Sequence, residues 1–301
     1  MEFRLLPKKE TGEGAAKVQA EKHQAGVRLP WAHLRLPPFP QIALRVLELA
    51  NQEDASVQSL CELIATDPAF AGEVLTTANS ILYAPRYPAS SLLQAVTILG
   101  SRALQGMCIT VGSRAYMGKA MNLPAMRALW LHNLACAMIA EGLAALGFVD
   151  KDVAYTAGIL HDVGRVALTV VQPRDYADLL DTQRGPSASI LAEERALFGL
   201  DHCEAGRQLV SEWRLPIELE PAIFDHHAPR PADSSWGLPE LIKVSCRMAD
   251  ACGFPGFAGC EAEPYTQLLE ELPARERRLF PDSAEELRAE IGARIQSIET
   301  L

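Results

Sequence analysis

The sequence predicts an all-α protein, a multi-helix bundle with a smaller helical subdomain at its amino-terminal end. Apolar residues recur at the three- and four-residue spacing of helices through most of the chain. Prolines and short polar capping residues stand where those apolar periods begin and end. Few segments show the strict polar and apolar alternation of strands. Together these three patterns favour helices in series over a sheet.

The composition of the chain indicates which partners it disfavours and which cellular compartment suits it. The 301 residues are 49% hydrophobic, which is enough for a sizeable core. Against 28 lysines and arginines stand 38 acidic residues, so the net charge of -10 opposes binding to nucleic acid or anionic membranes. Seven cysteines without any C-x-x-C pair indicate reduced thiols, and no apolar run of signal-peptide length follows the first charges. We expect a cytoplasmic protein without nucleic acid or membrane partners.

The amino-terminal third divides into an arm and a helical subdomain. Residues 1–30 lack an apolar period and are expected to form a flexible arm, followed by a subdomain over 31–120. Helices are expected after Pro40, after Ser56 and over 69–82, and Ser91 with Gln94 has the spacing of a capping box. Asn79 is expected to bridge backbone groups, and a set of aromatic side chains is expected to fill the core: Phe39, Phe70, Tyr83, Trp130 and Trp213.

Residues 121–301 are expected to form the main bundle. The longest helix follows Pro124 and runs over 125–146, and the next runs over 151–163, with Gly164 as its break. Residues 166–171 are too rich in β-branched side chains to assign. A capping box from Ser283 to Glu286 opens the last amphipathic helix. Four further helices are predicted between these, over 188–198, 203–213, 217–227 and 238–252.

Histidines are concentrated in the bundle in a way that predicts a metal site. Five of the seven histidines fall between positions 132 and 227. Imidazole and carboxylate groups suit divalent iron, manganese or zinc, and helices of a bundle can direct them into a shared core. The predicted ligands are His132, His161, Asp162, His202, His226, His227 and Asp250.

The number of donors suits two ions bridged by a shared carboxylate, for which Asp162 is the natural choice. Adjacent helical residues diverge by about 100°, so His161 and Asp162 can act together only at a helix end. Other roles are open for single members: His132 as a core or surface residue, Asp201 before His202 as a helix cap, and His226 with His227 as cations at a helix end.

Several segments carry a resemblance to a known family. The stretch AGILHDVGRVAL, residues 157–168, resembles the HD signature of metal-dependent phosphohydrolases, and its surroundings resemble the HDOD branch over about 31–252. The supporting segments are LPPFPQIALRVLELA at 36–50, TDPAFAGEVLTTANSILYA at 66–84, AVTILG at 95–100, LWLHN at 129–133 and DHCEAGRQLVSEWRLP at 201–216.

The resemblance implies a metal centre like that of the related HD-GYP phosphodiesterases. It places the five histidines and Asp162 at ligand positions and Asp250 as the closing aspartate. Asp162 and Arg165 are the candidate catalytic residues, with Arg165 as either a phosphate clamp or a surface cation. The segment APRPADSSWG after His227 lacks the Gly-Tyr-Pro loop with which those enzymes recognise substrate.

The resemblance therefore implies a bacterial signal-transduction protein more than a catalyst. We expect the HD-type core to bind one or two divalent transition metals or a phosphate-bearing ligand such as a nucleotide, and the amino-terminal helices to contact signalling proteins. An active metal-dependent phosphohydrolase or cyclic-dinucleotide phosphodiesterase is the alternative, and a scaffold with a vestigial site is a third.

Overall fold

The computed structural model describes residues 39–299, apart from 51, 53–54, 81–85, 146, 148, 214 and 230–234, and describes only the backbone of 297–299. The predicted arm over 1–30 and the predicted core residue Tyr83 lie outside the described residues.

The all-α prediction is confirmed, because helices make up nearly all of the regular structure described. The elements in order are α2 Gln41–Ala50, α3 Val57–Ala65, α4 Pro68–Ala78, α5 Leu92–Met117, η2 Gly118–Asn122, α6 Pro124–Ala144, α7 Lys151–Leu160, α8 Val163–Val171, α9 Pro173–Thr182, β1 Arg184–Gly185, η3 Ser187–Ser189, α10 Ile190–Phe198, α11 His202–Glu212, η4 Ile217–Leu219, α12 Glu220–Phe224, α13 Leu238–Ala251, β2 Gly259–Cys260, α14 Tyr265–Glu271, α15 Ala274–Arg277 and α16 Ala284–Glu299.

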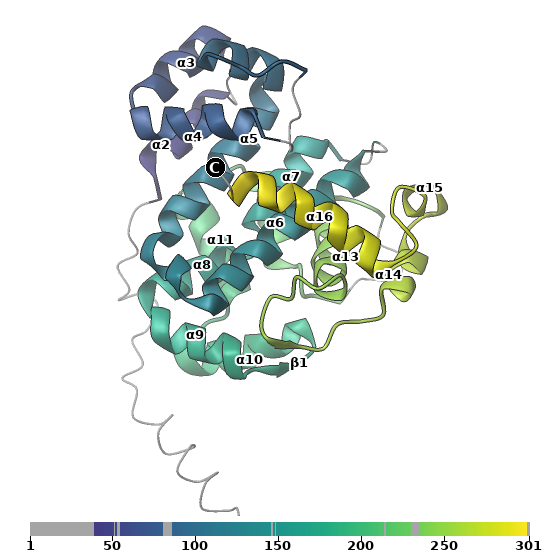
Figure 1. Cartoon of the computed structure of the whole chain (residues 1–301). Helices are drawn as coiled ribbons and strands as arrows, with labels where there is room; N and C mark the ends of the chain where they lie inside the picture. The colour runs from purple at the N-terminus through teal and green to yellow at the C-terminus, as the bar shows by residue number, and fades with distance from the viewer. Residues whose placement is uncertain are drawn as a thin grey trace, which may run out of the picture.

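The amino-terminal helices α2, α3 and α4 form a lobe above the rest of the molecule (Figure 1). Ser56 caps α3 and Asp67 caps α4, because each side chain accepts hydrogen bonds from the first helical turn. The bridging role expected for Asn79 is confirmed: its amide donates to the Ala89 carbonyl at 2.9 Å and accepts from the Ala89 N–H at 2.7 Å. These bonds fix the end of α4 against the segment that leads into α5.

Helix α5 joins this lobe to the bundle. It packs against α2, α3, α4 and α7 and has a kink at Gly100, where φ is 78°. The segment Leu92–Asn122 is long and apolar enough to cross a membrane by length and composition alone. Helix α5 packs against the helices of the amino-terminal lobe and also against helices of the bundle. The predicted division of the chain into a subdomain over 31–120 and a bundle over 121–301 therefore stays a prediction.

Two close helix crossings organise the bundle. Gly158 of α7 faces the backbone of Ala137 in α6, and Gly164 of α8 faces the carbonyl of His202 in α11, at separations that no Cβ atom would permit. Helix α13 also packs on α6 and α12. These crossings bring α6, α7, α8, α11 and α13 around one core.

The structure corrects three predicted boundaries. The break after α7 falls at His161 and Asp162 themselves, and Gly164 lies inside α8, where its missing side chain permits the approach to α11. The unassigned residues 166–171 are helical. The helix predicted over 217–227 is wrong, because a short η4 and α12 end at Phe224 and leave His226 and His227 in a turn.

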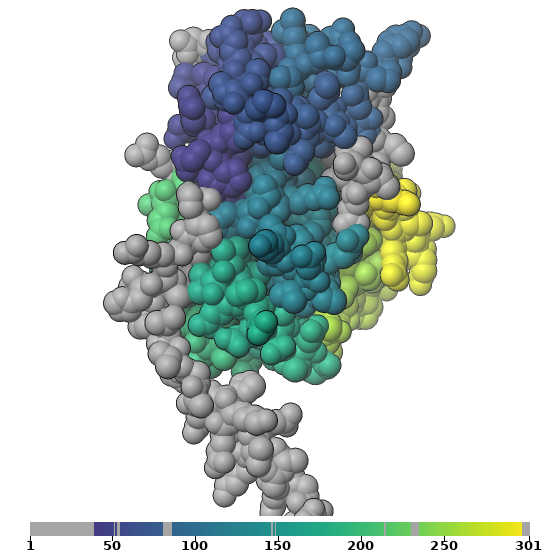
Figure 2. All heavy atoms as spheres, turned by 60° about the vertical axis from the view of Figure 1, so that its left-hand side comes forward, coloured from purple at the N-terminus to yellow at the C-terminus, as the bar shows by residue number. Residues whose placement is uncertain are grey.

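The carboxy-terminal elements cover the bundle from one side (Figure 2). Helix α16 packs on α6, and its side chains Leu287, Ile291 and Ile295 are buried. The two-residue strands β1 and β2 pair in parallel, which ties the segment after α9 to the segment after α13.

Candidate metal centre

The predicted site residues converge at the centre of the bundle. His132 comes from α6, His161 and Asp162 from the junction of α7 and α8, and His202 from the first turn of α11. His226 and His227 lie in the turn after α12. All of these side chains are buried except His227, which is half-buried. The chain thus brings six polar side chains from four regions into one apolar core.

Four of the histidines share one arrangement of their two ring nitrogens. In each, Nδ1 lies within 2.6 to 2.8 Å of an oxygen acceptor: Phe254 O for His132, Gly158 O for His161, a Glu194 carboxylate oxygen for His202 and Ile223 O for His226. Since each acceptor carries no proton, Nδ1 is the donor in every case. In the neutral rings Nε2 is therefore left with a free lone pair.

Those Nε2 atoms face the Asp162 carboxylate. Oδ1 of Asp162 lies 3.3 Å from Nε2 of His202 and 3.3 Å from Nε2 of His226. Oδ2 lies 3.6 Å from Nε2 of His161 and 3.9 Å from Nε2 of His132. Each oxygen thus serves a different pair of histidines, which is the arrangement of a carboxylate between two ions.

The possible donor atoms fall into two groups, and within each group all of them lie within 4.8 Å of one another. One group holds Asp162, His202, His226 and His227, and the other holds His132, His161 and Cys246. Cys246 lies on α13, with Sγ 3.5 Å from Nε2 of His132.

Asp250, one turn after Cys246, has a different position. Its Oδ1 accepts a hydrogen bond from Gly256 N at 3.0 Å and lies 3.4 Å from Nδ1 of His132, on the side of the ring away from Asp162. This geometry suits a residue that orients His132. Its role as a ligand stays a prediction.

Burial and neighbouring charges shift the pKa values of the Asp162 carboxyl and of three of the histidines in the centre. Burial raises the pKa of the Asp162 carboxyl, but Arg165 and His161 outweigh it and hold that pKa well below its usual range. Burial lowers the pKa of His161 and of His227 well below the ordinary value, so both rings are neutral. Burial also lowers the pKa of His202, but Glu194 more than compensates and raises it to about 9.

Arg165 is buried beside the centre, so its interpretation as a surface cation is wrong. Its Nε lies 3.2 Å from Asp162 Oδ1 and its Nη1 donates to the Gly256 carbonyl at 3.1 Å. Phe254 and Gly256 belong to the loop after α13, and both bind core residues of the centre. That loop therefore covers the centre.

Sequence reasoning missed Glu194 and Cys246. Glu194 is fully buried on α10, accepts hydrogen bonds from both Nδ1 and the backbone N–H of His202, and accepts another from the Tyr176 hydroxyl at 2.6 Å. Cys246 stands four residues before Asp250 on one helix face, a spacing that could have indicated it. The cap expected at Asp201 is present, as a capping box with Glu204.

The donor set fits divalent transition metals. Nε2 of His161, Nε2 of His227 and both Asp162 oxygens are buried without a hydrogen-bond partner in the described chain. Such atoms are costly to bury unless something compensates them. Nε2 of His202 and Nε2 of His226 are 3.2 Å apart, so a proton or a cation must keep their lone pairs from facing each other. Imidazole, carboxylate and thiolate groups are ligands that such metals prefer.

The fold and this histidine and aspartate centre define an all-α protein with an HD-type core. The profile of the HDOD domain family matches residues 36–229, and the chain belongs to that family. The match ends before α13, which supplies Cys246 and Asp250.

Known proteins share this fold at low identity. An HDOD domain protein of unknown function from Geobacter sulfurreducens is 24% identical, with a TM-score of 0.64 over 89% of this chain and 93% of that one. A protein from Shewanella amazonensis SB2B, proposed to be a metal-dependent phosphohydrolase, is 19% identical, with a TM-score of 0.62 over 93% of this chain and 98% of that one. An uncharacterized protein of Treponema pallidum (strain Nichols) is 25% identical over 198 residues, which cover 64% of this chain and 38% of that protein.

Proposed function

We propose that this chain is a bacterial signal-transduction protein whose HD-type core binds one or two divalent transition metal ions in a regulatory or structural role. His161, His132 and Cys246 would hold one ion, and His202, His226 and His227 the other, with Asp162 between them. A metal bound there would supply a Lewis acid able to polarise water or a phosphate oxygen.

One observation carries the metal assignment. Four histidines from separate segments each donate from Nδ1 to an oxygen and direct Nε2 toward the same carboxylate. Nδ1 partners of this kind fix the tautomer and the ring orientation of metal-bound histidines. A chance cluster of core histidines has no reason to repeat the arrangement four times.

Burial favours a regulatory role over catalysis. Asp162, Arg165 and four of the five histidines are at most 3% exposed. A phosphodiester would have to displace the loop that carries Phe254 and Gly256, or enter beside His227, before it met a metal ion. The chain also lacks the Gly-Tyr-Pro segment expected of a cyclic-dinucleotide phosphodiesterase.

The test is elemental analysis of protein purified without chelator, together with an assay of cyclic-dinucleotide hydrolysis. We expect one or two ions of iron, manganese or zinc per wild-type chain, with slow or no hydrolysis. Asp162→Ala removes the carboxylate between the two groups and should lose the metal, and His226→Gln should lose the ion of its own group, whereas Asp175→Ala, an exposed aspartate on α9, should retain the metal. The histidine variant is needed because Asp162→Ala also leaves Arg165 without its ion pair.

Two results would contradict this proposal in different ways. Metal-free wild-type protein after anaerobic purification would exclude the metal centre. Fast, metal-dependent turnover of a cyclic dinucleotide would keep the centre and make the phosphodiesterase alternative correct.

Location and partners follow as part of the same proposal. All seven cysteines are free thiols, which suits a reducing cytoplasm. The lobe formed by α2, α3 and α4 is available for contacts with other signalling proteins, and the acidic net charge disfavours nucleic acid as a partner.

A further inference from the structure

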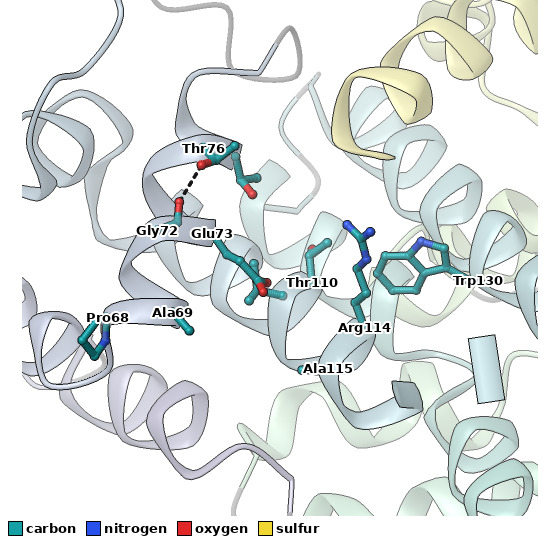
Figure 3. Close-up of a pocket in the computed structure, with 11 residues that line it drawn as sticks. Pro68, Ala69, Gly72, Glu73, Thr76, Thr110, Arg114, Ala115 and Trp130 are labelled. Atoms are coloured by element: carbon teal, nitrogen blue, oxygen red, sulfur yellow. Dashed lines mark hydrogen bonds between the residues drawn. The ribbon is translucent and has the colours of Figure 1, made fainter. Parts of the chain in front are cut away.

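A second site of interest lies away from the metal centre, in a cavity of about 540 Å³ between α4, α5 and α6 (Figure 3). It opens where the amino-terminal lobe meets the bundle. Its volume falls within the range of about 300–1,000 Å³ that is typical of small-molecule sites. None of the residues that line it belongs to the two metal-ligand groups.

The cavity is lined by polar and apolar groups in nearly equal measure, and part of its wall is buried. Val111 and Trp130 line it and are at most 6% exposed. The Thr110 hydroxyl, also on the lining, donates to the Gly106 carbonyl at 2.9 Å and forms a second hydrogen bond with the Tyr155 hydroxyl at 3.2 Å, so both of these partners lie within the protein. Val111 and Trp130 thus offer an apolar surface against which the hydrocarbon part of a small ligand could pack.

The outer part of the cavity carries two opposite charges on different helices. Glu73 extends from α4 toward α5, and Arg114 projects from α5 beside the indole of Trp130 (Figure 3). Both side chains belong to exposed residues, and neither forms an ion pair or a hydrogen bond with any other residue in the described part of the chain. They do not pair with each other, although both line the same cavity.

We propose that this cavity binds a small zwitterion that carries one ammonium group and one carboxylate or phosphate group. Arg114 would bind the anionic group, since a guanidinium matches carboxylate and phosphate oxygens. Glu73 would accept hydrogen bonds from the ammonium group. A ligand of a single charge would meet one attractive and one repulsive side chain, whereas a zwitterion satisfies both. Such a ligand connects α4 to α5 and α6, and so connects the lobe to the bundle.

The experiment measures thermal stability and heats of binding for the metal-containing full chain with a panel of probes. The probes are individual L-amino acids and, as the phosphate-bearing arm, phosphoethanolamine. We expect at least one of them to raise the melting temperature of the wild-type protein in a concentration-dependent way. Arg114→Gln and Glu73→Gln should each weaken that binding about tenfold to a hundredfold, because each removes a charged hydrogen-bonding partner. The arm that binds more tightly identifies carboxylate or phosphate as the anionic group.

Matched controls separate this cavity from other sites. Arg174→Gln on α9 and Glu48→Gln on α2 remove the same charges from exposed positions outside the cavity and should leave binding unchanged. Ala115→Phe adds a ring to the cavity wall without changing any charge and should block binding. Absence of binding by every probe would overturn the proposal, as would binding that survives both charge substitutions, which would point to chelation at the metal centre.

Discussion

Glu194 influences the orientation and the protonation of the His202 imidazole more than any other residue. One carboxylate oxygen accepts hydrogen bonds from Nδ1 of His202 at 2.6 Å and from its backbone N–H at 2.9 Å, and the other accepts from the Tyr176 hydroxyl. All three partners are buried. The carboxylate therefore fixes both the orientation of the imidazole and the nitrogen that carries the proton, which makes Glu194 a positioning residue for the metal centre.

Glu194→Gln should weaken metal binding about tenfold to a hundredfold, because an amide retains the volume but loses the negative charge that supports His202. In the metal-free protein, the pKa of His202 should fall from about 9 toward or below its ordinary value. Metal titration and NMR titration of the imidazole measure the two effects. Glu193→Gln, at the exposed neighbouring position, is the control, and an equal loss of affinity there would contradict the role of Glu194.

The residues of the centre differ in how far the sequence could predict them. His161 and Asp162 stand in a recognisable HD segment, and the other histidines follow from their clustering. No sequence pattern identifies Glu194, because it meets His202 only through the packing of α10 beside the start of α11. The signal for Cys246 was only its spacing of four residues before Asp250, because a buried cysteine on an apolar helix face is an ordinary core residue until the fold places His132 opposite it.

At the scale of elements, the crossing of α8 and α11 positions both Asp162 and His202. Gly164 lies two residues after Asp162 and faces the His202 carbonyl and the Gly206 amide. A side chain at position 164 would push α11 away from α8, because the His202 carbonyl and the Gly206 amide belong to the backbone and cannot move aside as a flexible side chain could.

Gly164→Ala should lower the free energy of unfolding by about 3 kcal/mol, since overpacking against backbone has no cheap relaxation. Gly292→Ala is the matched control, because nothing lies within 4 Å of a Cβ atom at that helical position. The control should raise stability by up to about 1 kcal/mol through helix propensity. Urea denaturation measures both, and equal stabilities for the two variants would refute the close crossing.

Arg247 links α13 to the segments at both ends of α14. Its guanidinium binds Glu263 at 2.5 and 2.6 Å and Glu271 at 2.7 Å. The hydrogen bonds from Arg247 hold the pKa of Glu263 below its usual range. A carboxyl whose folded pKa is depressed stabilises the protein above its unfolded pKa, and this contribution is lost as the pH falls through the folded value.

Glu263→Gln should therefore lower the free energy of unfolding at neutral pH by less than about 1 kcal/mol, the small value typical of exposed ion pairs. The difference from wild type should disappear well below about pH 4, where the unfolded and then the folded carboxyl are protonated. Glu261→Gln, which removes a nearby exposed carboxylate that does not bind Arg247, is the control variant. A constant difference across the pH range would be inconsistent with the ion pair.

Helix starts with local signals were predictable, whereas ends set by tertiary contacts were not. Pro124, Ser56, Asp67 and Ser283 mark the starts of α6, α3, α4 and α16 because capping is a property of a few adjacent residues. The end of α12 at Phe224 is different, because Nδ1 of His226 binds the Ile223 carbonyl and replaces the next helical donor. The two-residue strands are too short to show any alternation.

At the scale of the whole molecule, the proposed metal centre connects elements that are far apart in the chain. It joins α6, the α7–α8 junction, α11, the turn after α12 and α13, and the loop after α13 closes over it. Several buried polar atoms of the centre have no hydrogen-bond partner among the described residues. The core should therefore be markedly more stable with metal than without it.

Removing the metal with a chelator should lower the melting temperature by about 10 °C. An ion present at a thousand times its dissociation constant contributes about 4 kcal/mol, and each kcal/mol corresponds to about 2–4 °C in a large domain. Calorimetry with and without added metal measures the shift. His226→Gln should show a smaller shift than the wild type, because it removes a donor from one of the two groups and leaves Nε2 of His202 without its partner. Since native-state metal binding alone produces the shift, a wild-type melting temperature that does not respond to chelator or to added metal would show that these histidines form a metal-free polar core.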